Sequence, residues 1–153
     1  MKNPKKIIIS IIAIALVSFL TIPLSVKAET NEETRRAVFD SGHNVNVKIM
    51  NLAGTPIAGL GGSDDTVTSI KRSDSLTITP TEENTVSAGN SEIPIYMWFD
   101  NGTIYWYTED ENPKLNSDSS YMFSDLIKLE TIDVSNFDTS NVTNMSYMFS
   151  GCS

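Results

Sequence analysis

Apolar and polar residues alternate most clearly between residues 95 and 107, where two short runs rich in aromatic and β-branched side chains flank Asp100-Asn101-Gly102-Thr103. Alternation with a period of two is typical of β-strands, because successive side chains point to opposite faces of the sheet. Asn-Gly readily adopts the positive φ angles of a two-residue hairpin turn. The pattern therefore predicts a β-hairpin over residues 95–107, with cross-strand aromatic pairs worth up to about 1 kcal/mol each.

Upstream of this hairpin the alternation is weaker and predicts shorter elements. Residues 45–49 alternate between apolar and polar side chains, which favours a half-buried strand, but the apolar residues also fit a helical spacing, so a helix stays open. β-branched residues dominate 66–72 and 75–79, and both segments are predicted strands. Residues 81–92 have no apolar period and are predicted to form a surface loop.

One five-residue sequence occurs twice in the last third of the chain. Ser120-Tyr121-Met122-Phe123-Ser124 returns as Ser146-Tyr147-Met148-Phe149-Ser150, at an offset of 26 residues. Self-similarity at a period of this size is typical of solenoids, in which each repeat stacks on the next. The repeated sequence therefore predicts that residues 120–153 form a short repeat array, which stops inside its second repeat.

The apolar spacing between and within the two copies predicts how each repeat is built. Ile132 and Val134 lie two positions apart, which places them on one face of a short strand with Asp133 toward solvent. A second apolar stripe follows at steps of three and one, which predicts core packing or, as the alternative, a methionine-rich ligand groove. That stripe consists of Val142, Met145, Met148 and Phe149.

The segment Ile132–Ser153 resembles the repeat of the BspA-type leucine-rich-repeat surface proteins of bacteria, and Ile95–Tyr107 is similar to the strand-rich region that precedes such repeats. The resemblance is close over residues 93–153 and weak over residues 41–91. It implies a mainly β fold with short helical or 3₁₀ turns, in which a strand-rich N-terminal region and a hairpin lead into an incomplete leucine-rich-repeat-like solenoid. It also implies a secreted or cell-surface binding protein rather than an enzyme. Such proteins carry many repeats, so we also consider that this chain is a truncated fragment.

The first 28 residues have the pattern of a secretory signal peptide. Lys2, Lys5 and Lys6 precede an apolar run from Ile7 to Leu20, and Val26-Lys27-Ala28 supplies the small residues of a cleavage site. The alternative is an uncleaved membrane anchor, but a run of 14 residues is shorter than the roughly 20 needed to cross a bilayer. We therefore expect cleavage after Ala28, secretion or cell-surface localisation, and contact with membrane only through an uncleaved signal segment.

The charge of the remaining chain argues against nucleic acid as a partner. Four of the 11 basic residues and none of the 19 acidic residues lie in residues 1–28, so the remainder has a net charge of −12. Such a surface repels phosphate groups. Two short acidic runs, Asp64-Asp65 and Glu109-Asp110-Glu111, lack the ligand spacing of a calcium loop, and no metal or other cofactor is expected.

Catalytic residues are not evident in the sequence. Cys152 is the single cysteine and His43 the single histidine, with no nucleophile motif around either. A pair of carboxylates could serve glycoside hydrolysis, and Asp100 and Glu109 are conceivable members of such a pair. The sequence does not give their separation, and we expect no enzymatic activity.

Two functional hypotheses remain. The first is a non-enzymatic secreted or surface protein whose repeats bind an extracellular protein or a host-surface ligand in adhesion. The second is a secreted carbohydrate-binding module or glycan-active enzyme that uses Trp98 and Trp106 with nearby carboxylates. The candidate binding surface consists of Trp98, Tyr105, Trp106 and Asp133.

These patterns divide the chain into four segments. The first is the signal peptide over residues 1–28, and the second is a partly flexible strand and loop region over residues 29–92. The aromatic hairpin and its connection, residues 93–119, are predicted to cap the solenoid. The solenoid itself takes up residues 120–153.

Overall fold

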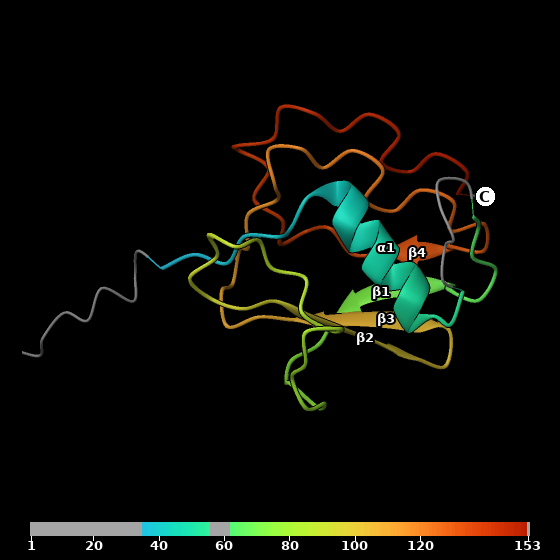
Figure 1. The fold of residues 1–153 in the computed structure, drawn as a ribbon, viewed down its shortest axis with the longest axis horizontal. Helices are drawn as coiled ribbons and strands as arrows, with labels where there is room; N and C mark the ends of the chain where they lie inside the picture. The colour runs from blue at the N-terminus through green and yellow to red at the C-terminus, as the bar shows by residue number, and fades with distance from the viewer. Residues whose placement is uncertain (1–34, 56–61, 153) are drawn as a thin grey trace, which may run out of the picture. The chain divides into compact units, whose positions relative to one another are not determined.

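The computed structural model describes residues 35–55 and 62–152, which all belong to one compact unit, Asn31–Ser153 (Figure 1). The predicted signal peptide lies outside the described residues. The described part of the chain is mainly β-sheet with one α-helix. Its elements are α1 (Gly42–Leu52), β1 (Ser69–Arg72), β2 (Tyr96–Asp100), β3 (Thr103–Tyr107) and β4 (Thr131–Ile132).

Helix α1 replaces the strand that we predicted for residues 45–49, and the helical alternative is the correct one. The helix begins after Ser41, whose hydroxyl accepts a hydrogen bond from the N–H of Asn44, the usual role of a serine N-cap. It ends at Leu52 with Ala53 as its C-cap, and Gly54 follows with a φ of +82° that glycine adopts without strain. The helix buries Val45 and Ile49, four positions apart, so a stripe that resembled alternation is one face of a helix.

The four strands form one sheet in the order β2-β3-β1-β4. Strands β2 and β3 are antiparallel and joined by Asn101 and Gly102, with φ angles of 44° and 84°, so the predicted hairpin and its turn are confirmed. Strand β1 runs parallel to both β3 and β4, which confirms a strand within the predicted segment 66–72.

Two sequence predictions fail in the regions around this sheet, and the predicted loop 81–92 is irregular as expected but lies only partly on the surface. Residues 75–79 contain no strand. The predicted surface loop 81–92 is not fully exposed, because Val86 is buried and its N–H donates to the carbonyl of Ile95 beside β2. Strand β4 stops at Ile132, and Val134 is 46% exposed instead of sharing the buried face. Asp133 is exposed, as predicted.

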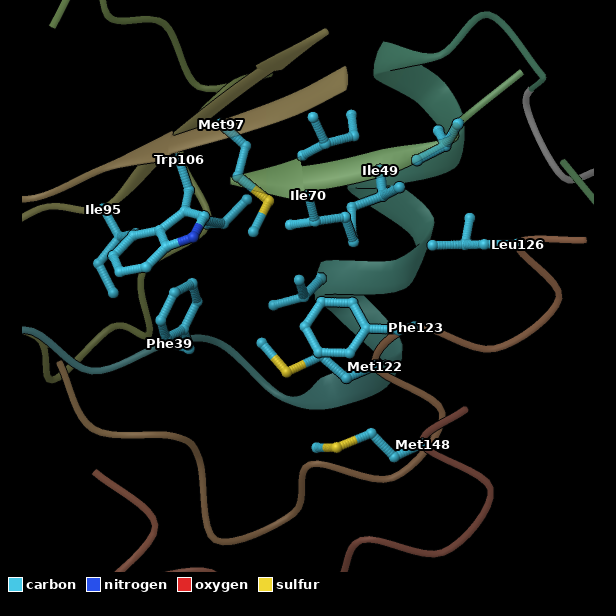
Figure 2. Packing of buried hydrophobic residues seen from close by; sticks show 14 of the residues in the cluster. Phe39, Ile49, Ile70, Ile95, Met97, Trp106, Met122, Phe123, Leu126 and Met148 are labelled. Carbon is cyan, nitrogen blue, oxygen red and sulfur yellow. The ribbon is translucent and has the colours of Figure 1, made fainter. Parts of the chain in front are cut away.

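The core lies between the sheet, α1 and the turns of the last third of the chain (Figure 2). Phe39 packs edge-on against Trp106 and against Phe137, with ring centroids 5.9 Å and 5.3 Å apart. Met122 and Phe123, from the first copy of the repeated sequence, are fully buried. Residues from all three predicted segments after the signal peptide therefore share one core.

Backbone hydrogen bonds join the two copies of the repeated sequence along their length. The N–H groups of Ser119, Tyr121, Phe123 and Asp125 donate to the carbonyl groups of Asn144, Ser146, Met148 and Ser150, at 2.9, 3.1, 2.9 and 2.7 Å. Each bond joins residues 25 positions apart, so it follows the 26-residue offset of the sequence. Figure 1 shows the two segments, orange and red, running side by side.

Side chains at equivalent positions of the two copies also stack. The rings of Tyr121 and Tyr147 lie 5.1 Å apart at 15°, and those of Phe123 and Phe149 lie 5.5 Å apart at 23°. Tyr121 and Tyr147 share a left-handed backbone, with φ angles of 61° and 60°. The copies therefore agree in backbone conformation as well as in sequence.

An earlier segment packs against the first copy in a similar way. The N–H of Phe39 donates to the carbonyl of Lys114 at 2.9 Å, and the N–H of Gly42 donates to that of Asp118 at 2.8 Å. Three segments therefore stack on one another as successive layers. They are residues 37–46, residues 114–126 and residues 138–152. We refer to the last two as the first coil and the second coil.

Candidate functional site

The face of the sheet that points away from α1 carries a group of aromatic side chains, which we call the outer face. The antiparallel register of β2 and β3 pairs Tyr96 with Tyr107 and Trp98 with Tyr105. Lys71 of β1 pairs with Tyr105 on its other side and is exposed. All four aromatic side chains are half-buried. The outer face therefore presents four aromatic rings and one cation on one side of the sheet.

The predicted binding residues do not all lie on this face. Trp98 and Tyr105 are brought together, with ring centroids 5.7 Å apart at 21°. Trp106 lies on the opposite face and is 1% exposed, so its place in a binding surface is a wrong prediction. Alternation along β3 requires this, because Tyr105 and Trp106 are neighbours and must point to opposite sides.

Asp133 lies apart from these rings and has a local structural role. It follows β4, which is separated from β3 by β1, so it lies two strands, or about 10 Å, from Tyr105. Its carboxylate accepts hydrogen bonds from the hydroxyl and the N–H of Ser135, which lower its pKa. The same turn recurs where an Asp or Asn accepts the N–H of the residue two positions later, at Asp118, Asp138 and Asn144.

The carboxylates considered for glycoside hydrolysis lie at opposite ends of the hairpin. Asp100 pairs with Thr103 at the turn, whereas Glu109 follows the far end of β3. The strand between them spans roughly 13 Å, more than the 5–10 Å that separates the two carboxylates of glycosidases. This geometry gives no support to a catalytic role for the pair.

His43 and Cys152 also occupy ordinary structural positions. His43 is exposed in the first turn of α1 and has no hydrogen-bond partner among the described residues. The thiol of Cys152 is half-buried and donates to the carbonyl of Phe123 at 3.0 Å. Burial raises the pKa of this thiol, which disfavours the reactive thiolate.

The acidic runs act as hydrogen-bond acceptors within the fold. Asp64 is buried and accepts from the N–H groups of Thr66 and Val67, at 2.9 and 2.6 Å, and from the hydroxyl of Thr55. Burial acts to raise the pKa of Asp64, but these hydrogen bonds outweigh it and hold the pKa below its ordinary value. Within the described residues, no three His, Cys, Asp or Glu side chains are grouped so that they could hold a metal ion.

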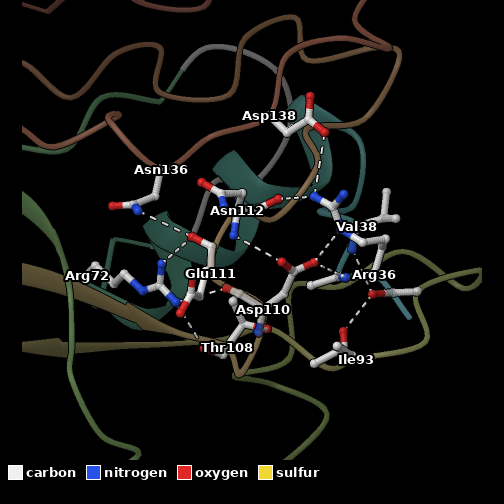
Figure 3. A network of polar contacts seen from close by, with 12 residues as sticks. Arg36, Val38, Arg72, Ile93, Thr108, Asp110, Glu111, Asn112, Asn136 and Asp138 are labelled. Carbon is white, nitrogen blue, oxygen red and sulfur yellow. Dashed lines mark hydrogen bonds and ion pairs between the residues drawn. The ribbon is translucent and has the colours of Figure 1, made fainter. Parts of the chain in front are cut away.

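Two arginines organise the residues after β3 (Figure 3). Arg36 forms an ion pair with Asp110 at 2.9 Å, contacts Asp138 at 3.5 Å and donates to the carbonyl of Asn112. Arg72 donates to the carbonyls of Glu111, Asp110 and Thr108 at 2.6, 2.8 and 3.3 Å, and its guanidinium lies 5.1 Å from the centre of the Trp106 ring. These contacts tie the N-terminal segment and β1 to the loop that leads into the first coil.

An open hollow of about 670 Å³ lies over this network. Its lining has charged groups of both signs, including Arg36, Asp110 and Asp138, which already neutralise one another. A ligand would have to compete with these internal pairs. We therefore assign the hollow a structural role in joining segments of the fold.

The lowered pKa of Asp110 predicts how the stability of the fold changes at acidic pH. Burial acts to raise its pKa, but the N–H of Ala37, the guanidinium of Arg36 and the N–H of Asn112 outweigh that effect and lower the pKa. Because the folded pKa lies below that of the unfolded chain, about 3.9, the contribution to stability is present above this value and is lost as the pH falls through the folded pKa.

We expect Asp110→Asn to lower the free energy of unfolding at pH 7 by about 1–3 kcal/mol, because charge-assisted hydrogen bonds are lost. The loss of stability below about pH 4 should also be smaller in this variant than in the parent chain. Urea unfolding at several pH values measures both effects. Glu83→Gln removes an exposed carboxylate and should leave the midpoint at pH 7 unchanged. Equal pH dependence in Asp110→Asn and the parent would contradict the assignment.

Sequence analysis did not identify several residues of the outer face and of the arginine network. Tyr96, Tyr107 and Lys71 join the outer face through strand pairing, and the alternation of residues 95–107 would have identified the two tyrosines once the register was known. Arg36 and Arg72 carry no local signal, since their partners lie 34 or more positions away.

Comparison with known proteins gives one match. Residues 99–153 match the model of a family described as Mycoplasma protein of unknown function, DUF285. The matched residues include β3, β4 and both coils. No curated protein and no solved structure matches the chain. Helix α1 is too short to cross a bilayer, and none of the described residues form a longer apolar helix that could do so.

Proposed function

We propose that this chain is a non-enzymatic, exported protein of the BspA-like leucine-rich-repeat type, which binds an extracellular protein or host-surface ligand through its sheet. The observation that carries the proposal is the hydrogen-bonded ladder between the first and second coils, which follows the 26-residue repeat of the sequence. The family match covers the same part of the chain in which the resemblance to BspA-type proteins is close.

The ladder supports a short solenoid. In a solenoid each repeat contacts its neighbours, and equivalent residues stack from one repeat to the next. The stacked pairs Tyr121–Tyr147 and Phe123–Phe149 have this relation. In this proposal the hairpin forms one end of the sheet beside β1, and residues 37–46 provide the first layer.

The outer face is the proposed binding surface. Solenoids use extended faces rather than deep pockets, and the outer face has the aromatic content that dominates the energy of protein interfaces. Trp98 and Tyr105 are already stacked on each other, so little conformational entropy is lost when a partner covers them. Lys71 beside them supplies a charge that a partner could pair.

The carbohydrate alternative receives less support. Its second tryptophan, Trp106, is buried beneath the sheet. Trp98 has one ring face against Tyr105, which leaves less of the indole free to stack on a sugar. The carboxylates Asp100 and Glu109 lie beyond opposite ends of β3. The function we propose is therefore protein binding.

A binding panel tests the proposal. Residues 29–153 are expected to bind at least one purified extracellular protein and no member of a glycan array. Trp98→Ala and Lys71→Glu should each weaken this binding on the order of tenfold, because both change the centre of the outer face. His43→Ala, on the helix behind the sheet, is the matched control and should bind normally. Glycan binding that is lost in Trp98→Ala, or turnover of a glycan or ester substrate, would contradict the proposal.

A further inference from the structure

Two exposed tyrosines pack against each other between the first and second coils. The ring centroids of Tyr121 and Tyr147 lie 5.1 Å apart, and the ring planes are inclined by 15°. Tyr121 is 43% exposed and Tyr147 is 61% exposed. The described residues include all five tyrosines of the sequence, and among them no other two tyrosine rings are in contact. Two phenol groups are therefore held together at a surface that solutes can reach.

The exposure of Tyr121 shows that the tyrosine position lies beside the stack of layers. Tyr121 belongs to the first coil, which contacts residues 37–46 on one side and the second coil on the other. It stays 43% exposed in this middle layer, whereas Phe123, two positions later, is fully buried. In the first coil the tyrosine position therefore faces solvent and the phenylalanine position faces the core.

The backbone keeps the two tyrosines next to each other. The N–H of Tyr121 donates to the carbonyl of Ser146 at 3.1 Å, one residue before Tyr147. The two tyrosines have φ angles of 61° and 60°, so their side chains leave adjacent coils in the same direction. Groups that are tethered side by side have a far higher effective concentration than groups on separate molecules. A reaction between these rings is therefore favoured over a reaction between two chains.

We propose that Tyr121 and Tyr147 are the site of an oxidative cross-link, a dityrosine bond that joins the first coil to the second. The oxidant is a haem peroxidase that consumes hydrogen peroxide. The observation behind this inference is the contact of two exposed phenol rings, which only this pair of tyrosines makes within the described residues. The proposal does not depend on the function of the outer face.

The cross-link forms by removal of two hydrogen atoms. The peroxidase takes one electron and the hydroxyl proton from each phenol, which leaves two tyrosyl radicals. A C–C bond then forms between a Cε atom of Tyr121 and a Cε atom of Tyr147, and the hydrogens of these carbons move through water to the phenol oxygens. The electrons and protons removed reduce one hydrogen peroxide to two waters. The rings must turn out of the stack to bring the Cε atoms together, and exposed side chains turn within picoseconds to nanoseconds.

The bond would constrain the chain as a disulfide does. The sequence has a single cysteine, Cys152, so these 153 residues cannot form a disulfide among themselves. A bond between Tyr121 and Tyr147 closes a loop of 26 residues (147 − 121) and restricts the unfolded chain. The cross-linked form should therefore have a midpoint of thermal unfolding about 5–10 °C above that of the untreated chain.

Treatment of the 29–153 chain with a haem peroxidase and hydrogen peroxide, at micromolar protein concentration, tests this inference. The expected product is a monomer with dityrosine fluorescence and a mass lower by two hydrogen atoms. Proteolysis and mass spectrometry should find the fragments of Tyr121 and Tyr147 joined. Hydrogen peroxide without the peroxidase is the control, and it should add oxygen to exposed methionines such as Met145 without forming the cross-link.

Three variants complete the experiment. Tyr121→Phe and Tyr147→Phe keep the stacked rings but remove a phenol, so each should lose the cross-link and the rise in unfolding temperature. Tyr96→Phe, on the outer face, is the matched control and should be cross-linked like the parent. Circular dichroism of α1 verifies that each variant is folded. Failure of the parent to cross-link, coupling mainly between chains, or a cross-linked monomer that persists in Tyr121→Phe would each overturn the proposal.

Discussion

Gly42→Ala is expected to unfold the protein or to reduce its stability by about 3 kcal/mol or more, since added atoms in a packed interior force the backbone to move. A Cβ at this position would lie 2.3 Å from the carbonyl oxygen of Ser120 and 2.4 Å from the carbonyl carbon of Ser119. Both are backbone atoms that cannot rotate away. The N–H of Gly42 donates to Asp118 at the same contact, so separating the layers would also break a hydrogen bond. Proteins have only about 5–15 kcal/mol of total stability, so this loss is large.

Gly89 provides the matched control for this substitution. A Cβ at Gly89 meets no atom within 4 Å, and its backbone is not left-handed. Gly89→Ala should therefore leave stability unchanged or raise it by up to about 1 kcal/mol, because alanine has less conformational freedom in the unfolded chain. Urea unfolding followed by circular dichroism of α1 compares the two variants. Equal midpoints for Gly42→Ala and the parent would show that helix α1 does not lie against the first coil.

Phe123→Ala is expected to cost about 3–5 kcal/mol, the range for removing a buried phenylalanine ring and leaving a cavity. The ring of Phe123 is fully buried, between the core and the ring of Phe149. The same substitution at the equivalent position, Phe149→Ala, should cost about 1 kcal/mol, since that ring is 45% exposed and loses mainly one aromatic contact. The two variants remove the same residue type at the same position of the repeat. Phe123 lies in the first coil, which is covered, and Phe149 in the second coil, which is exposed.

The free energies of unfolding of the two variants, measured in urea, decide this prediction. Tyr147→Ala serves as a further control, because Tyr147 is 61% exposed and its replacement should have a small effect. If Phe123→Ala and Phe149→Ala lose similar amounts of stability, the two coils do not have the different environments described here. A large loss in Phe149→Ala alone would indicate that the second coil is covered in solution.

Local sequence patterns predicted the elements whose partners are near in the chain. The hairpin of β2 and β3 follows from alternation on both sides of Asn101-Gly102, since the turn brings adjacent residues together. The 26-residue repeat was equally visible, and the ladder between the coils follows its offset. The predictions of export and of cleavage after Ala28 come from residues outside the described part of the chain and stay predictions.

Short patterns were ambiguous where two structures share the same spacing. Residues 45–49 fit a strand, but Ser41 caps a helix and Gly54 follows its C-terminal cap, so Val45 and Ile49 face the core from one side of α1. Val134 fits a strand two positions after Ile132, but β4 ends first because β1 pairs with only two of its residues. At residues 45–49 the local residues that begin and end the helix selected between the alternatives, whereas at Val134 the strand β1, which lies far away in sequence, did so.

The sequence by itself determined the hairpin, the repeat and the acidic net charge of the chain. Only the tertiary structure decided that Trp98 faces outward and Trp106 inward, because alternation defines two faces of a strand but not which of them the helix covers. It also decided the partners of Arg36 and the need for glycine at position 42. These depend on contacts between layers some 75 residues apart in sequence, and no local pattern records such contacts.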